Sequence, residues 1–105
     1  MSVIRFVYVP CPSVDVAKSL AKSALHARLA ACANVFPGIQ SLYWWDGEVQ
    51  DDAEAVLLLK TDQIHLAALE AHLIEVHPYD VPCVAVMVPE SVNAAYADWL
   101  MSELG

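Results

Sequence analysis

A run of three aromatic residues, Tyr43, Trp44 and Trp45, ends at an Asp-Gly dipeptide and constrains the fold more than any other feature. Asp-Gly is typical of a two-residue β-turn, so the pattern predicts a hairpin in which Trp45 pairs with Glu48. Successive side chains of a strand point to opposite faces, which places large rings on both faces of this hairpin. One small domain cannot cover both faces, so we expect something outside the chain to cover them.

The rest of the sequence predicts strands and helices in one domain of residues 1–105. Strands are expected over Val3–Val9, over Ala31–Val35 and Ile39–Trp45 around a Pro37-Gly38 bend, from Glu48 to Lys60, and over Val81–Val88. Helices are expected to begin at caps provided by Ser13, by Thr61 or Asp62, and by Asn93. The order βαββαβ plus a last helix predicts an α+β, ferredoxin-like sandwich with a long central hairpin and a C-terminal helix.

Three of the expected strand segments, Val3–Val9, Ala55–Lys60 and Val81–Val88, are apolar on both faces. Helices of a ferredoxin-like fold cover only one face of the sheet, so the other face would expose a larger apolar patch than monomers usually tolerate. We therefore expect a homo-oligomer joined through the open sheet face and the projecting hairpin.

Charge and composition exclude several classes of partner. The formal net charge is −8, with only five lysines and arginines, which argues against nucleic acid. The apolar runs fall short of the ~20 residues of a membrane span, and the first residues lack the pattern of a signal peptide. We expect no membrane partner and a cytoplasmic protein. Three widely spaced cysteines suggest reduced thiols rather than a disulfide framework.

His77 and the cysteines are the candidate metal ligands. His77 lies between a helix and Pro78, and Cys83 follows six residues later. Together with Cys32, these side chains suit copper or another divalent ion, although a helix cap and packed thiols explain the same residues. A thiol hydrolase, with Cys83 as nucleophile, His77 as base and Asp80 as orienting carboxylate, is a weaker alternative because no oxyanion motif accompanies it.

Aromatic residues spread along the chain can also line a cleft for a small molecule. Tyr43, Trp44, Tyr79 and Trp99 are the candidate contacts, and interface packing between subunits explains them equally well. Lys60 is the only lysine in the expected sheet, and it can neutralise an anionic ligand. A sensor of a small anionic metabolite is therefore an alternative function.

The sequence resembles the CutA divalent-cation tolerance proteins. The matching segments are Leu29–Asn34, Ser41–Gly47, Glu54, Leu57–Thr61, His77–Pro82, and Tyr96 with Trp99. They follow one another over nearly the whole chain.

The resemblance implies a homotrimer with interlocking strands and a role tied to copper and other divalent cations. Our first hypothesis is a binding or regulatory role without catalysis. It also implies a likeness to the trimers of PII signalling proteins, which bind effectors between subunits. His77 matches the family histidine proposed to contact metal, and Cys32 matches a frequent cysteine. Cys83 stands where the family commonly has glutamate, so a softer sulfur replaces an oxygen ligand.

Overall fold

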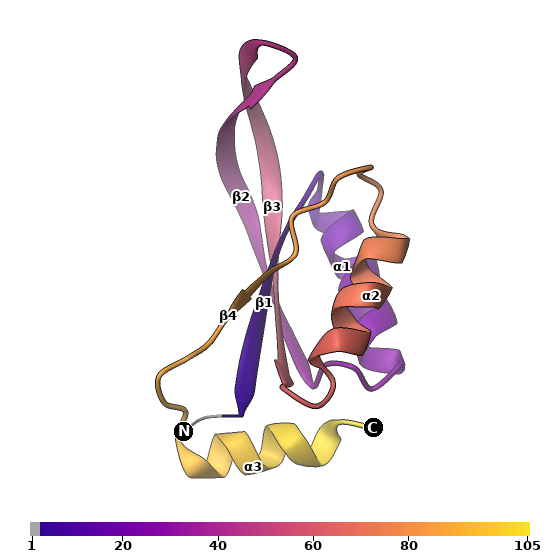
Figure 1. The fold of residues 1–105 in the computed structure, drawn as a ribbon, viewed down its shortest axis with the longest axis vertical. Helices are drawn as coiled ribbons and strands as arrows, with labels where there is room; N and C mark the ends of the chain where they lie inside the picture. The colour runs from indigo at the N-terminus through magenta and orange to yellow at the C-terminus, as the bar shows by residue number, and fades with distance from the viewer. Residues whose placement is uncertain (1–2) are drawn as a thin grey trace.

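The computed structural model describes residues 3–105 as a four-stranded antiparallel sheet with three helices (Figure 1). The elements are β1 (Ile4–Cys11), α1 (Val14–His26), β2 (Cys32–Trp45), β3 (Glu48–Asp62), α2 (Leu66–Val76), β4 (Ala85–Met87) and α3 (Ala94–Glu103). The strand order is β2-β3-β1-β4. Helices α1 and α2 lie side by side on one face of the sheet, and α3 crosses the end opposite the hairpin tip. The predicted ferredoxin-like sandwich is confirmed.

The β2-β3 hairpin has the predicted register. Trp45 pairs with Glu48 across the turn. Asp46 and Gly47 both have positive φ, 52° and 78°, as a type I′ turn requires. The pairing shifts between Phe36 and Ile39, so the predicted Pro-Gly irregularity is a bulge. The hairpin projects beyond the helices and makes the molecule elongated, with extents of 45 × 26 × 22 Å (Figure 1).

The core lies between the sheet and the two covering helices. Alternate residues of β1 and β3 point into it, and α1 contributes mostly alanines, whose small side chains let the helix lie close to the sheet. The fully buried core side chains include Val7, Val9, Leu57, Leu59, Ala17, Ala24, Leu69 and Leu73. The Ser13 hydroxyl accepts a hydrogen bond of 3.2 Å from the amide of Val16, which confirms the predicted cap of α1.

The prediction of a strand over Val81–Val88, buried on both faces, is wrong for the single chain. Only Ala85–Met87 form a strand, and all three residues are exposed. Val81 and Val88 remain 81% and 62% exposed. The segment pairs with β1 alone at the sheet edge, so half of its backbone has no neighbour and its side chains are not covered.

Two boundaries also differ from the expectation. Strand β1 continues through Pro10 to Cys11, because β4 reaches only as far as Tyr8 and the missing amide of Pro10 costs no ladder bond on that side. Asp62 belongs to β3 and caps a turn before α2, since its Oδ1 accepts from the amides of Ile64 and His65. Thr61 does not cap the helix and donates instead to the carbonyl of Leu29, at 2.7 Å.

The sheet face away from α1 and α2 stays partly open. Tyr8 and Pro10 of β1 are half-buried on that face, whereas Val7 and Val9 on the helix face are fully buried. At the distal end of the hairpin, Trp44 is 76% exposed. Among the helices of residues 3–105, none is long and apolar enough to cross a membrane.

Candidate functional site

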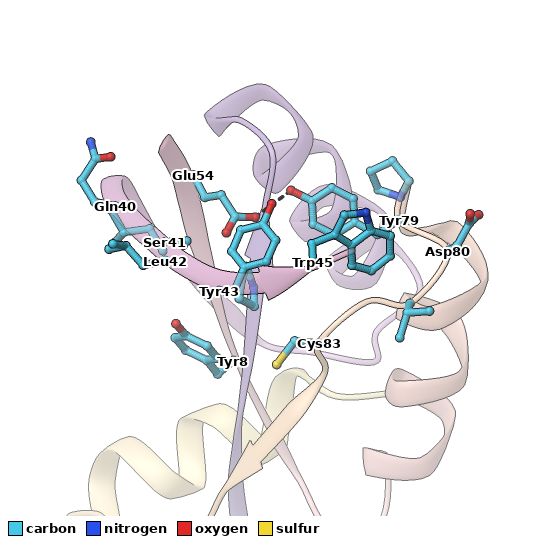
Figure 2. Close-up of a pocket in the computed structure, with 14 residues that line it drawn as sticks. Tyr8, Gln40, Ser41, Leu42, Tyr43, Trp45, Glu54, Tyr79, Asp80 and Cys83 are labelled. Carbon is cyan, nitrogen blue, oxygen red and sulfur yellow. Dashed lines mark hydrogen bonds between the residues drawn. The ribbon is translucent and has the colours of Figure 1, made fainter. Parts of the chain in front are cut away.

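A groove of about 930 Å³ lies where the hairpin leaves the sheet, facing the loop that follows α2 (Figure 2). Aromatic and polar side chains of β1, β2 and β3 meet those of the loop there. The lining consists of Tyr8, Pro10, Ile39–Tyr43, Trp45, Glu54, Pro78–Val81 and Cys83. No lysine, arginine or histidine is among these residues.

Strand alternation explains why these side chains share one surface. Ile39 pairs with Glu54 across the hairpin, and Tyr43 and Trp45 follow Ile39 on the same face of β2. Tyr8 lies on the open face of β1. The proline stop after α2 then turns the chain so that Tyr79 reaches the hairpin from the other side (Figure 2).

Two phenols donate hydrogen bonds to carboxylates at this groove. The Tyr79 hydroxyl donates to Oε2 of Glu54 at 2.6 Å, and the Tyr43 hydroxyl donates to Asp52. Burial, followed by the bond to Glu54, raises the pKa of Tyr79, while the bond to Asp52 is the main cause that raises the pKa of Tyr43. Both tyrosines are therefore neutral donors at neutral pH.

His77 is buried, and both of its ring nitrogens are occupied. Nδ1 accepts the amide hydrogen of Tyr79 at 3.1 Å, so the proton must sit on Nε2, which donates to the carbonyl of Pro10 at 2.9 Å. The ring also packs against Tyr79, with centroids 4.8 Å apart. His77 thus ties the loop after α2 to the end of β1 and orients Tyr79 toward the groove.

These bonds bear on the hydrolase alternative. A general base needs a free nitrogen lone pair directed at the nucleophile. The Nδ1 lone pair of His77 accepts from a backbone amide instead, and Cys83 and Asp80 are not its hydrogen-bond partners. The geometry therefore gives no support to a Cys-His-Asp triad.

The three thiols lie in separate environments. Cys83 is exposed and lines the groove, whereas Cys11 is buried and its Sγ donates to the carbonyl of Val9 at 3.4 Å. Burial, and secondarily the charge of Glu54, raises the pKa of Cys11 to about 11. Cys32 pairs with Lys60 in the sheet, and its side chain lies near the Tyr96 hydroxyl. All three are free thiols.

The predicted metal ligands therefore do not gather within one subunit. Across residues 3–105 there is no group of three or more histidine, cysteine or acidic side chains arranged to hold a metal ion. His77 and Cys83 belong to the loop around the groove, and Cys32 lies beside Tyr96 of α3. A complete metal site would need a ligand from outside the single subunit or a rearrangement of the His77 bonds.

The predicted small-molecule contacts divide into two groups. Tyr43 and Tyr79 line the groove, but Trp44, Lys60 and Trp99 do not. The Lys60 ammonium lies 5.5 Å from the ring centre of Phe6 and 5.3 Å from that of Tyr96, where it holds α3 against the sheet by cation–π contacts.

Trp99 packs on the Tyr96 ring, with centroids 5.6 Å apart, so it belongs to the same α3 cluster as Lys60.

The sequence analysis did not single out Glu54 and Tyr8 as groove residues. The signal for Glu54 was its register opposite Ile39, which follows directly from the correctly predicted turn because the bulge lies beyond Ile39.

Comparisons with known proteins identify close relatives of this chain. A family model described as "CutA1 divalent ion tolerance protein" matches residues 5–103. "Protein CutA 1, chloroplastic" of Oryza sativa is 46% identical over 94 residues, which are 90% of this chain and 53% of that protein. The chain thus spans about half the length of this relative. It covers 96% of "Divalent-cation tolerance protein CutA" of Thermus thermophilus, at 39% identity over 99 residues, or 94% of this chain.

A solved structure agrees with these relatives. The crystal structure of CutA1 from Oryza sativa superposes with a TM-score of 0.93 at 42% identity, and it covers 97% of this chain and 94% of that chain. The likeness therefore extends over the whole described fold, the projecting hairpin and the loop after α2 included.

Proposed function

This chain belongs to the CutA1 divalent ion tolerance family, and we propose that it serves divalent-cation tolerance as a non-catalytic homotrimer that binds copper or another divalent ion. The family match over residues 5–103 is the single observation that carries the proposal. The groove supplies supporting chemistry, because carboxylates and the exposed thiol of Cys83 line it without a competing basic side chain.

The proposed ion contacts are Cys83 and His77, with Cys32 as a further candidate. His77 can ligate only after Nδ1 gives up the Tyr79 amide or Nε2 gives up the Pro10 carbonyl. A site at the boundary between subunits removes part of this difficulty, since a neighbouring subunit can complete the ligand set around Cys83.

Isothermal titration with Cu²⁺ and Zn²⁺ tests the metal contacts. We expect wild-type protein to bind more tightly than about 100 μM, and His77→Ala and Cys83→Ser each to weaken binding by at least about tenfold. His26→Ala is the matched control, because His26 is exposed at the end of α1. Equal binding by all four proteins, or no binding in this range, would reject the proposed ligands.

The trimer is supported by what one subunit leaves uncovered. Leu42, Trp44 and Trp45 are 67%, 76% and 64% exposed on the hairpin, and Met87 is 43% exposed at the edge of the sheet. Large side chains on both faces of a projecting ribbon are costly in water, and neighbouring subunits would bury them.

Light scattering after size exclusion tests the assembly directly. We expect a mass of about three times 11.5 kDa for the wild type, and partial dissociation for Trp44→Ala at low protein concentration. Val3→Ala is the control, because Val3 is half as exposed, at 36%, and lies outside the hairpin. A wild-type monomer would overturn the trimer but would leave the metal titration as a separate question.

The absence of catalysis and the cytoplasmic compartment are parts of the same proposal. The family name describes tolerance rather than a reaction, and His77 uses its nitrogens for structure. Ester hydrolysis that is lost in Cys83→Ser would contradict a non-catalytic role. Cell fractionation tests the compartment, which a relative named chloroplastic shows to vary among family members.

A further inference from the structure

We propose that the segment at the end of α3 is a proton-operated latch, which holds the last turns of α3 in place while both ring nitrogens of His65 carry protons and releases them when one proton leaves. The latch consists of His65, Asp62, Gly105, Arg28 and Glu103. It lies beneath α1 and α2, at the end away from the hairpin tip, rather than on the open sheet face (Figure 1). It shares no residue with the groove or with the proposed metal ligands.

The ring of His65 faces a hydrogen-bond acceptor on each side. Nδ1 lies 2.7 Å from Oδ1 of Asp62, and Nε2 contacts the carbonyl oxygen of Gly105. Each acceptor requires a proton on the nitrogen that faces it, so the two bonds form together only in the doubly protonated imidazolium. The His65 side chain is only 19% exposed, which leaves little room for water to replace either acceptor. One protonation state therefore links the chain after α3 to β3.

Loss of one proton from His65 breaks the bond to Gly105 and keeps the bond to Asp62. The Asp62 carboxylate is a charged acceptor, and the amides of Ile64 and His65 hold its Oδ1 in place, so the remaining proton stays on Nδ1. Nε2 then directs a lone pair at the Gly105 carbonyl, and two acceptors in contact repel each other. The bond to Asp62 is the main cause that raises the pKa of His65 above 6.5, and the Gly105 carbonyl adds to it. The latch is therefore closed at acid pH and opens as the pH rises through this pKa.

Arg28 forms the other side of the latch. Its φ of 58° places it in the left-handed region after α1, where glycine is the usual residue. Its Nη1 donates to the carbonyl and to Oε2 of Glu103, at 3.0 Å each, and its own carbonyl accepts the Gly105 amide at 3.0 Å. A Cβ added at Gly105 would lie 2.9 Å from Cβ of Arg28, so the segment fits this closely only with glycine. Arg28 and Glu103 pair with each other, and Asp62 is the charged group that faces His65.

Helix α3 depends on the latch because its own ends are weakly stabilised. Asn93 makes no side-chain cap bond, the first turn has no acidic residue and the last turn has no basic residue. Leu100 is the only buried residue of the helix. Lys60 holds Tyr96, one turn earlier, by a cation–π contact of 5.3 Å. Opening of the latch should therefore release the turns after Tyr96 locally, without unfolding the sheet.

Amide hydrogen exchange of the assembled wild-type protein tests the latch. Rates are measured over a series of pH values on both sides of neutrality and divided by those of an unstructured chain, because exchange itself accelerates with pH. We expect the protection of residues 99–103 to fall about three- to tenfold as the pH rises, as loss of one hydrogen bond predicts. The amides that pair β2 with β3 near the hairpin turn should keep their protection.

Three variants separate the latch from other causes. His65→Gln should show weak protection of α3 at every pH, because a glutamine amide cannot donate at both ends. Gly105→Ala should weaken the protection at acid pH, since the added methyl group meets Arg28. His26→Gln, at an exposed site on α1, should follow the wild type. Unchanged protection near the hairpin turn shows that each variant is folded.

Two results would overturn the latch. The first is a wild-type α3 whose protection does not depend on pH, which is also the outcome if neighbouring subunits hold α3 in the assembly. The second is a pH dependence in His65→Gln that equals that of the wild type.

Discussion

The two halves of strand β3 belong to one continuous ladder but have opposite surroundings. From Ala55 to Asp62 most side chains are buried beneath the helices or α3, and Leu57 and Leu59 are fully buried. From Glu48 to Ala53 nearly every side chain is exposed, although each of these residues pairs with β2 beyond the bulge. Backbone pairing alone therefore does not bury the distal half, and in the proposed trimer neighbouring subunits would cover its apolar side chains.

Two leucine-to-alanine variants measure the difference between the buried and the exposed halves. Leu57 lies in the buried half of β3, and Leu42 lies on β2 opposite Asp51 of the exposed half. Leu57→Ala removes a fully buried side chain and should lower the free energy of unfolding by about 2–5 kcal/mol at every protein concentration. Leu42→Ala, at a site 67% exposed, should cost less than about 0.5 kcal/mol when the subunits are dissociated.

Urea unfolding over a wide range of protein concentration checks both values. The cost of Leu42→Ala should grow with concentration as the subunits associate, because an interface buries what the subunit exposes. A large cost for Leu42→Ala in dissociated protein would show that the distal half is stabilised from within the chain. The contrast drawn between the two halves of β3 would then be wrong.

Substitutions at the glycines of the hairpin test whether the backbone conformation of its turn stabilises the distal half. Gly47 has φ +78°, and no atom lies within 4 Å of the position of an added Cβ, so Gly47→Ala should cost about 1 kcal/mol through the backbone alone. Gly38, at the bulge of the same hairpin, has equal space and a φ outside the left-handed region. Gly38→Ala should be neutral or slightly stabilising. Thermal melts compare them, and equal losses would argue against a backbone cause.

Local chemistry made much of this fold predictable from sequence. The Asp-Gly turn fixed the register of the hairpin, Ser13 marked the start of α1, and the element order led to the right topology. The prediction of a strand over Val81–Val88 buried on both faces was wrong, because the composition of this segment resembles that of a buried strand. The exposure of the segment depends on its position in the sheet. A run of β-branched residues does not indicate whether its strand lies at the edge or in the centre of a sheet.

The candidate site was less predictable than the fold. Tyr43 and Tyr79, two of the predicted contacts, both line the groove, whereas His77, the predicted metal ligand, makes two hydrogen bonds, to the carbonyl of Pro10 and from a backbone amide. Such partners are invisible in the residue types. Lys60 was singled out for an anion because it is the only lysine in the expected sheet, whereas its contacts with the rings of Phe6 and Tyr96 come from other elements.

The smallest expected effect is a pH dependence at the end of the well-packed half. His65 contacts Asp62 through Nδ1, at 2.7 Å, and the carbonyl oxygen of Gly105 through Nε2, so it joins β3 to the residues after α3. The bond to Asp62 is the main cause that raises the pKa of His65 above 6.5, and the Gly105 carbonyl adds to it.

Because the folded pKa is the higher one, the stabilisation from His65 is fully present below pH 6.5 and is lost as the pH rises through the raised pKa. Melting temperatures at acid and alkaline pH should therefore differ less for His65→Gln than for the wild type, while His26→Gln, at an exposed site on α1, should follow the wild type. An unchanged pH dependence in His65→Gln would mean that α3 is anchored without this contact. The Lys60 and Tyr96 cluster would then suffice to hold it.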